Sequence, residues 1–358
     1  MSDFPSRAPQ WSRSAELASS LWFALDSAHR FIILQRWGLD KVCELEFTFL
    51  RKHQETHFLE GLKKLGLEDE PDHEKAAKYH VLSNVLGGLD MGYRSDDQGR
   101  AWVFYFPPSA FGASPLHPGP GICAVPSDTF LAGLRGWHAN NGVLLGNDRL
   151  RFTITQLMSE GGPYDAGFFD VAESPLSEDG RLRVSLGLGE EVLPGPIPDL
   201  GPATWPQARK DKALQKYCAQ YAIGGLAQIA EFTDLQEAAI IIEQSVASVF
   251  SSWARQLMHE FALYDDNPVL QMARLFQTCH EFIGDDFETL GTGSEVVLLH
   301  KNTRLSVPEY DGWALPPHQI LEAMGRGWSS VSRTVGPTVR VAPQPTSSNQ
   351  VAWTFSAQ

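Results

Sequence analysis

The sequence predicts an α+β protein made of two pseudo-repeated units, each a helical bundle packed on a short antiparallel sheet. Long segments with apolar residues at helical spacing are followed by short segments in which polar and apolar residues alternate, as in half-buried strands. These segments occur in the same order in both halves of the chain. The 358 residues, 43% of them hydrophobic, are enough to fill the cores of two ordinary domains.

In the first half, three amphipathic helices precede the first strand, and a fourth helix separates that strand from two more. Ser127 or Asp128 stands where it can cap the fourth helix, and the Gly-rich segment "SEGGPYD" joins the last two strands. The expected helices are 14–36, 39–66, 72–88 and 126–146, and the expected strands are 101–108, 149–157 and 166–171.

The second half repeats this order of elements. Its expected helices are 211–230, 234–263, 267–283 and 316–336, and its expected strands are 294–301, 338–343 and 350–355. "PSDTFLAGLRGW" aligns with "PPHQILEAMGRGW", and this alignment pairs Pro126, Arg135, Gly136 and Trp137 with Pro317, Arg326, Gly327 and Trp328. Convergence of two short amphipathic helices is the alternative to a true repeat.

A Pro- and Gly-rich stretch separates the two copies and predicts a linker at 172–207, with one strand candidate at "RLRVSL". The expected organisation is therefore a first helix-plus-sheet unit at 1–171, which carries the candidate site, and a second, degenerate copy at 208–358.

Charge restricts the expected partners. The formal net charge is −14 and the pI is about 5.2, with no Lys- or Arg-rich run to compensate. Such a surface repels phosphate backbones and anionic lipids, so we expect neither nucleic acid nor a membrane as partner. Asp26, His29 and Arg30 interrupt the most apolar early run, "SLWFALDSAHRFIILQRWG", and predict an amphipathic helix rather than a membrane span.

The four cysteines are scattered without a CxxC motif, and the N-terminus lacks the apolar core of a secretory signal. Both features predict reduced thiols and a cytoplasmic protein. The Gly-rich turns lack a P-loop lysine and no Rossmann fingerprint occurs, so no nucleotide cofactor is indicated. A duplicated unit is compatible with a homodimer, but no coiled-coil or edge-strand signal decides the oligomeric state.

The stretch "ELEFTFLRKHQETHF" carries the main candidate site. Helical spacing places Glu46, His53 and His57 on the same broad face as Val42, Leu45, Phe49 and Leu50, and that apolar face should point inward. Because buried carboxylates and imidazoles are costly to desolvate, the three polar side chains need one another, a ligand or a metal.

Three interpretations of this site stay open. His53 and His57 are four residues apart and can converge on one zinc or iron ion, with Glu46 as a third ligand. Without a metal, Glu46 would tune a histidine that activates water as a general base. In a purely structural role, one histidine is solvated and Glu46 pairs with an arginine. The comparable helix at 240–261 carries no histidine pair, which favours a specialised first unit.

Weaker candidates lie elsewhere. Cys123 lies in the Gly/Pro loop "GPGICAVP", where a thiol could be exposed, and His138 could face a cavity after the anchoring Trp137. Cys279 and His280 in "TCHEF" diverge by about 100° on a helix. They cannot form a Cys–His nucleophile with each other, although either could meet a partner from another element.

The segment "GNDRLRFTITQLMSEGGPYDAGFFDV" (146–171) resembles bacterial L-2-amino-thiazoline-4-carboxylic acid hydrolase-like proteins. Stretches from "LWFALDSAHRF" to "GICAVPSDTF" are similar to a wider set of bacterial cytosolic proteins, in which a cysteine stands at the position of Cys123. The resemblance implies a hydrolase acting on a small cyclic C–N substrate. Asp165 stands where those hydrolases tend to carry a cysteine, and Tyr164 and Asp165 join Cys123 and His138 as pocket-lining candidates.

These observations predict a small-molecule enzyme, foremost a hydrolase of a C–N bond in a cyclic or amide-like substrate. Glu46, His53 and His57 would supply acid–base or metal-assisted chemistry. A lyase or isomerase could use the same residues. The arrangement is also similar to helix-plus-sheet sensor domains, so a non-catalytic small-molecule-binding protein is the main alternative.

Overall fold

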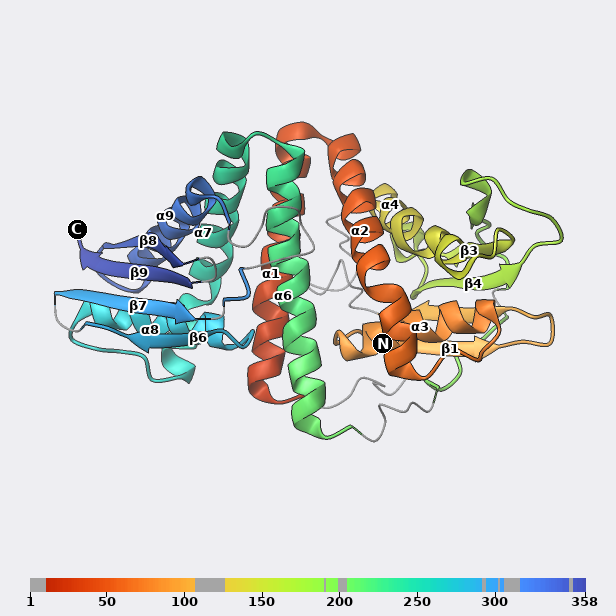
Figure 1. Ribbon diagram of the computed structural model, residues 1–358, viewed down its shortest axis with the longest axis horizontal. Coiled ribbons are helices and arrows are strands. Elements are labelled where there is room, and N and C mark those ends of the chain that lie inside the picture. Colours follow the sequence, from red (N-terminus) through yellow and green to blue (C-terminus); the bar gives the residue numbers. More distant parts are fainter. Residues whose placement is uncertain are drawn as a thin grey trace. The chain divides into compact units, whose positions relative to one another are not determined.

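The computed structural model describes residues 11–106, 126–189, 191–198, 205–291, 294–301, 303–305, 316–347 and 350–358. Its elements, most of which are labelled in Figure 1, form two sheets and a larger set of helices, which confirms the α+β class. The chain divides into two compact units. The first is built from Trp37–Ala213, and the second combines Ser12–Arg36 with Leu214–Gln358.

Apart from the helix predicted at 14–36, the first unit follows the predicted order of elements. It has two further strands, one of them the candidate in the expected linker, and several short turns. Its helices are α2 (Leu39–Leu65), α3 (Asp72–Leu86), α4 (Ser127–Trp137) and α5 (Asn141–Leu145), with single 3-10 turns at η1 (His138–Asn140), η2 (Met158–Glu160) and η3 (Asp179–Arg181). Its strands are β1 (Met91–Ser95), β2 (Ala101–Tyr105), β3 (Leu150–Gln156), β4 (Asp165–Val171) and β5 (Leu182–Val184).

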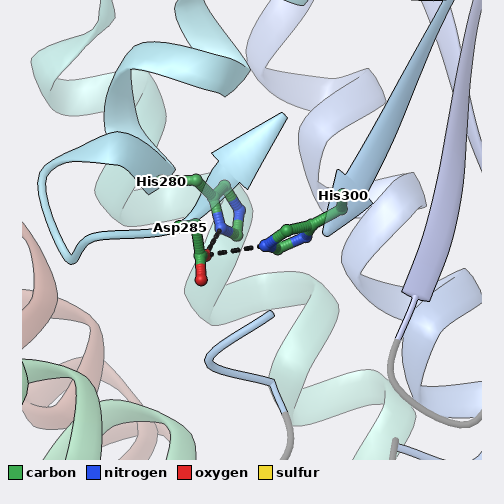
Figure 2. Close-up of side chains that lie close together, drawn as sticks. All are labelled: His280, Asp285 and His300. Carbon is green, nitrogen blue, oxygen red and sulfur yellow. Dashed lines mark hydrogen bonds and ion pairs between the residues drawn. The ribbon is translucent and has the colours of Figure 1, made fainter. Parts of the chain in front are cut away.

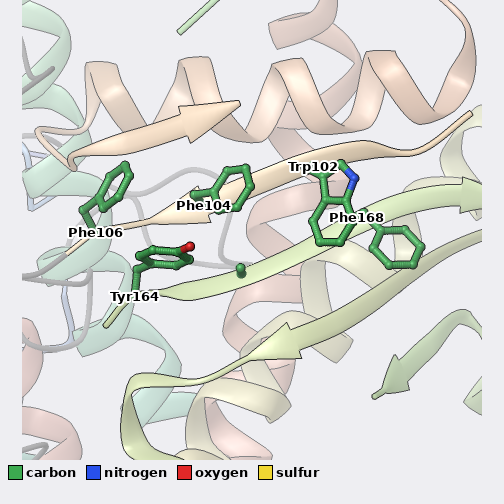
Figure 3. Close-up of a cluster of buried hydrophobic side chains, with 6 residues drawn as sticks. Trp102, Phe104, Phe106, Tyr164 and Phe168 are labelled. Atoms are coloured by element: carbon green, nitrogen blue, oxygen red, sulfur yellow. The ribbon is translucent and has the colours of Figure 1, made fainter. Parts of the chain in front are cut away.

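The sheet of the first unit has the order β1-β2-β4-β3-β5, antiparallel throughout except that β5 runs parallel to β3. Alternate residues of a strand point to opposite faces. One face carries Tyr105 and Phe169 toward the helices. The other carries a buried aromatic cluster, seen in Figure 3, with Val192 packed against it; its members are Trp102, Phe104, Phe106, Tyr164, Ala166 and Phe168. The expected linker thus contributes β5 and part of this packing.

The second unit has a four-stranded antiparallel sheet in the order β6-β7-β9-β8. Asp234 and Asn267 cap α7 and α8 by accepting hydrogen bonds from the first-turn backbone N–H groups. The helices are α1 (Arg13–Trp37), α6 (Gln207–Phe232), α7 (Leu235–Glu260), α8 (Pro268–Glu281) and α9 (His318–Val335), and the strands are β6 (Asp286–Thr289), β7 (Glu295–Lys301), β8 (Val339–Ser347) and β9 (Gln350–Ala357).

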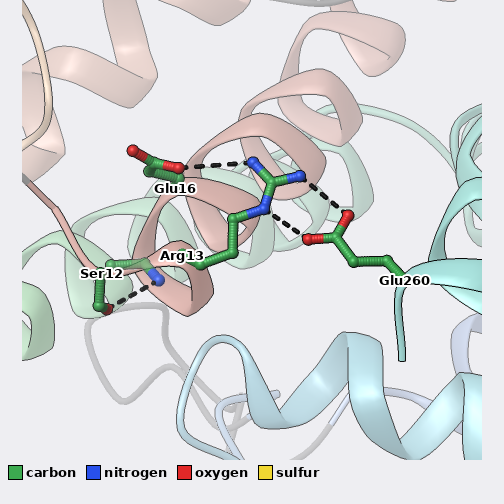
Figure 4. Close-up of polar contacts among 5 residues, drawn as sticks. Ser12, Arg13, Glu16 and Glu260 are labelled. Atoms are coloured by element: carbon green, nitrogen blue, oxygen red, sulfur yellow. Dashed lines mark hydrogen bonds and ion pairs between the residues drawn. The ribbon is translucent and has the colours of Figure 1, made fainter. Parts of the chain in front are cut away.

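Helix α1 lies in the second unit, whereas the sequence assigned it to the first. The Trp22 indole N–H donates to the Cys279 carbonyl oxygen at 3.1 Å. The Arg13 guanidinium bridges Glu16 and Glu260, as Figure 4 shows. The Trp22–Cys279 and Arg13–Glu260 contacts join residues 257 and 247 positions apart, which is why periodicity alone placed the helix with its sequence neighbours.

The helix predicted at 14–36 forms, but its three polar residues are inside rather than on a solvated face. Asp26, His29 and Arg30 are 7%, 1% and 3% exposed. Asp26 and Arg30 form an ion pair one turn apart, so their charges largely offset each other's desolvation. Burial lowers the pKa of His29 to about 3, which keeps its imidazole neutral.

The two units share one arrangement of strands and one close helix contact. The order β1-β2-β4-β3 matches β6-β7-β9-β8. Gly136 of α4 approaches α2, and Gly327 of α9 approaches α7, each with too little room for a side chain. These two glycines are paired in the sequence alignment. The duplication itself stays a prediction.

Alanine at either glycine should destabilise the fold. A Cβ at Gly136 would lie 2.5 Å from the Phe47 carbonyl oxygen, and one at Gly327 would lie 2.8 Å from the Val246 Cβ. Overpacking costs about 1–3 kcal/mol, which outweighs the helix propensity gained, about 1 kcal/mol or less. We therefore expect Gly136→Ala and Gly327→Ala to lower the free energy of unfolding in urea titrations.

Gly180→Ala is the matched control, because its new Cβ would have its nearest neighbour at 3.4 Å. Unchanged stability of both helix variants would contradict the close helix contact.

Candidate functional site

The polar residues predicted on α2 separate into one buried and two half-buried side chains. Glu46 is fully buried, as the spacing predicted, whereas His53 and His57 are half-buried at the edge of the helix face. The two imidazole rings meet edge to face with centroids 4.5 Å apart, and His53 also lies against Trp137. The two histidines therefore form one aromatic cluster with Trp137.

The metal interpretation of these residues finds no geometric support. In the described part of the chain, one group of three His, Cys, Asp or Glu side chains has its ligand atoms within 4.8 Å of one another, and it does not include Glu46, His53 or His57. The physical reason is the helix: Glu46 lies two turns from the His pair. An acid–base role for these three residues stays a prediction.

The four pocket-lining candidates lie in different surroundings. Cys123 lies outside the described residues. Tyr164 belongs to the aromatic cluster on the sheet face opposite the helices. Asp165 starts β4 and accepts a hydrogen bond from the Met158 N–H at 2.7 Å, and burial raises its pKa to about 6. Asp165 thus holds the β3–β4 connection in shape. His138 takes part in a buried polar network.

That network joins α2, α3 and the α4–α5 connection through amide side chains. Asn140 Nδ2 donates to Gln54 Oε1 at 2.7 Å, and Gln54 Nε2 donates to Asn141 Oδ1 at 2.6 Å. Asn141 Nδ2 in turn lies 2.7 Å from His80 Nε2. Because the Asn141 Oδ1 already accepts a hydrogen bond, its Nδ2 is the donor to His80 Nε2. The His80 ring is therefore neutral, with its proton on Nδ1.

The two imidazoles of the network stack on each other and on the sheet. The His80 and His138 rings have centroids 3.8 Å apart at an interplanar angle of 11°, and both stack on Phe169. The Tyr105 hydroxyl lies 2.7 Å from His138 Nε2. Burial lowers the pKa of His80 to about 3 and that of His138 well below its ordinary value. Two stacked neutral imidazoles in a dry core favour a structural role.

A cleft of about 570 Å³ opens elsewhere on the first unit, between α2, α4 and the η3–β5 segment. Apolar side chains such as Phe47, Leu131 and Leu182 form part of its wall. Its charged lining combines five carboxylates with three guanidinium groups, namely Asp40, Glu44, Asp128, Glu178, Asp179, Arg51, Arg135 and Arg181. Of the seven residues chosen from the sequence, the six that the structure describes do not line this cleft.

Cys43 is the one thiol among the described residues that line the cleft. Its side chain is half-buried, and burial raises the pKa of the thiol. A raised pKa leaves the sulfur protonated at neutral pH, and the thiolate is the nucleophilic form. Cys43 is therefore a wall of the cleft rather than an activated nucleophile.

The second unit holds a titratable cluster that sequence reasoning did not assemble. His280 lies in the last turn of α8, Asp285 precedes β6 and His300 lies in β7, and all three side chains are fully buried. Asp285 Oδ2 lies 2.9 Å from His280 Nδ1 and 3.0 Å from His300 Nε2, as Figure 2 shows. Asp285 Oδ1 accepts the Arg304 backbone N–H at 2.7 Å.

Protonation in this cluster follows from its contacts. Burial raises the pKa of Asp285, but its close contacts with the two histidines outweigh this effect, and the pKa falls below its ordinary value. Burial lowers the pKa of His280 despite the neighbouring carboxylate. Asp285 is therefore ionised and His280 neutral at neutral pH.

Comparison with known proteins adds no relatives. The chain matches no protein-family model, and it matches neither a curated protein nor a solved structure. Among the helices of the described chain, none has both the length and the apolar character needed to cross a bilayer. The family resemblance of 146–171 stays a prediction, and the site must be judged on its geometry.

Acid should destabilise the first unit through its buried imidazoles. The pKa of His80 falls from about 6.5 unfolded to about 3 folded, so the unfolded state binds the proton first. Stability is then full above about pH 6.5 and is lost as the pH falls toward 3, by up to about 1.4 kcal/mol per pH unit. His80→Gln should reduce this slope in urea titrations between about pH 7.5 and 5.

His318→Gln, at an exposed histidine of α9, should leave the slope as in the wild type. A slope in His80→Gln equal to that of the wild type would show that His80 is not held neutral.

Proposed function

We propose that the protein binds a small amphoteric molecule in the cleft between α2, α4 and the η3–β5 segment. Such a molecule carries both an anionic and a cationic group, as amino acids and their cyclic or amide-like derivatives do. This proposal keeps the predicted substrate class but moves the binding residues away from Glu46, His53 and His57. The observation that carries it is the presence of unpaired charges of both signs in one cleft.

One arginine of the cleft is committed to the fold. The Arg51 Nε donates to the Gly136 carbonyl oxygen at 2.9 Å, and its Nη2 donates to the Arg135 carbonyl oxygen at 3.3 Å. Arg51 also lies 3.7 Å from Glu178 and over the Phe47 ring. Its guanidinium thereby satisfies the carbonyl groups at the end of α4 and forms a fixed wall.

The other two arginines are available to a ligand. Within the described residues, neither Arg135 nor Arg181 has an ion-pair partner, and the Arg181 Nε is buried without a hydrogen-bond acceptor. A buried donor without an acceptor costs about 1–3 kcal/mol, which a ligand carboxylate would recover. These two guanidinium groups are the proposed anion-binding pair.

The carboxylates of the cleft provide the complementary half. Asp40, Asp128 and Asp179 likewise form no ion pair in the part of the chain that the structure describes. Opposite charges that line one cleft without contacting each other favour a guest that pairs with both sets. An amine on the ligand would meet the carboxylates, and the apolar wall would accept a hydrocarbon part.

Binding without turnover is favoured over hydrolysis. No histidine is among the residues lining the cleft in the described chain, and the pKa of Cys43 is raised. General-base and nucleophilic catalysis both need an activated group within hydrogen-bond reach of the substrate. A sensor or carrier role therefore fits these residues better than the predicted C–N bond hydrolase.

The cleft should discriminate matched probes by charge. We expect L-phenylalanine to bind more tightly than 3-phenylpropanoate, which lacks the amine, and 2-phenylethylamine, which lacks the carboxylate. Arg135→Ala and Arg181→Ala should each weaken binding by about tenfold, the loss expected for one charge-assisted hydrogen bond. Isothermal titration calorimetry measures all three affinities, and the remaining proteinogenic amino acids extend the series.

Arg149→Ala is the control, because Arg149 is exposed in the same unit outside the cleft. If no amino acid binds better than its singly charged analogues, the proposal is wrong. Hydrolysis of L-phenylalaninamide, followed by ammonia release, would instead support the enzyme predicted from the sequence.

A further inference from the structure

The His280, Asp285 and His300 side chains come from three consecutive elements that meet only in the folded chain. His280 is in the last turn of α8, Asp285 lies in the turn before β6, and His300 lies in β7, paired with Phe287 of β6. Figure 2 shows the two ring nitrogens turned toward one carboxylate oxygen. A ligand bound by His280 and His300 would link the end of α8 to β7.

The donor set and spacing suit a transition-metal ion. Two imidazole nitrogens and a carboxylate oxygen are ligands that Zn²⁺ accepts, and the same trio binds non-haem iron. Ligand atoms about 2.0 Å from a tetrahedral ion are about 3.3 Å apart. The nitrogens of His280 and His300 lie 2.9 and 3.0 Å from Asp285 Oδ2. These two distances would have to lengthen by only a few tenths of an ångström, and the ligand atoms of all three residues lie within 4.8 Å of one another.

Hydrogen bonding alone leaves the cluster incompletely satisfied. His280 Nδ1 makes a directed hydrogen bond to Asp285, but His300 Nε2, although 3.0 Å away, is among the buried atoms without a hydrogen-bond partner. In the described chain, His280 Nε2 and His300 Nδ1 also lack partners. Asp285 forms its ion pairs there with these two histidines, and no lysine or arginine neutralises the buried carboxylate.

The surroundings are dry and aromatic. The Trp22 ring lies edge-on to His280 at 5.2 Å, Phe276 lies 4.4 Å from the same ring, and Phe287 stacks on His300 at 4.3 Å. A carboxylate enclosed in this way is costly unless a cation is close. The Arg304 N–H bond to Asp285 Oδ1 fixes the carboxylate so that Oδ2 faces both imidazoles, as outer-shell bonds do in metal sites.

We propose that His280, Asp285 and His300 bind one divalent transition-metal ion, Zn²⁺ in the first instance, which stabilises the second unit. The site is separate from the ligand cleft of the first unit and does not depend on the function proposed there. Its complete burial suits an ion taken up during folding and retained. The ion would replace an incompletely hydrogen-bonded three-residue contact with bonds to helix α8, the turn before β6 and strand β7.

The test measures metal in the full-length protein. Chain expressed in zinc-supplemented medium and purified without chelator should hold one zinc ion per chain by elemental analysis and native mass spectrometry. Expression with Co²⁺ should give the visible absorption of a bound Co²⁺ ion with nitrogen ligands. Asp285→Asn and His300→Gln should lower metal content by more than about tenfold. His259→Gln, at an exposed histidine of the same unit, should retain the ion.

Chelation should lower the Tm of the wild type and of His259→Gln but not that of Asp285→Asn. Because the ligand variants could fail to fold, the wild-type stoichiometry decides the question independently of them. Folded wild-type protein without bound metal after expression with zinc, cobalt or iron would overturn the proposal. Full metal content in soluble Asp285→Asn and His300→Gln would overturn it as well, by showing that the ion is held elsewhere.

Discussion

Desolvation of imidazoles and carboxylates is the constraint that shapes both units. Each unit draws histidines into a core where water cannot reach them, and a polar group left alone there costs several kcal/mol. The first unit answers with neutral partners: an amide chain from Asn140 through Gln54 and Asn141 ends on His80. The second unit answers with a charge, because Asp285 lies between two histidines. Neutral amide partners suit a packing network in the first unit, whereas a carboxylate partner suits the ion-binding cluster that we propose in the second.

This difference arises at comparable places in two similarly ordered sheets. Tyr105 lies near the end of the second strand of the first sheet, and His300 lies near the end of the second strand of the other. Tyr105 offers a hydroxyl to His138, which a neutral core tolerates. His300 instead faces a carboxylate from the turn before β6. The two cores therefore have different polar partners near the end of the second strand.

Local pattern predicted the helices and the α+β class, and it also predicted the burial of Glu46. It failed where a small error in the angular position of a residue on a helix, or a contact between residues distant in sequence, decides which side chains are buried or meet. On α2 the buried face continues through Gln54 and Phe58 rather than His53 and His57. The periodicity therefore predicted which face is buried, but it assigned the two histidines to that face in place of Gln54. The short edge strands β1 and β6 show little alternation and went unnoticed. His280, Asp285 and His300 are spread over 21 positions, and only the turn after α8 and the β6–β7 pairing bring them together.

The position of α1 extends the same argument to the order in which the chain can fold. Trp22 donates to the Cys279 carbonyl and packs its ring beside His280, so the aromatic wall around the second cluster includes a residue from the start of the chain. The whole of the first unit separates these residues in sequence. The second core can therefore close only after the chain between them has been made, at the entropic cost of a long loop. A bound ion that joins α8 to β7 would stabilise the part of the second unit against which Trp22 packs.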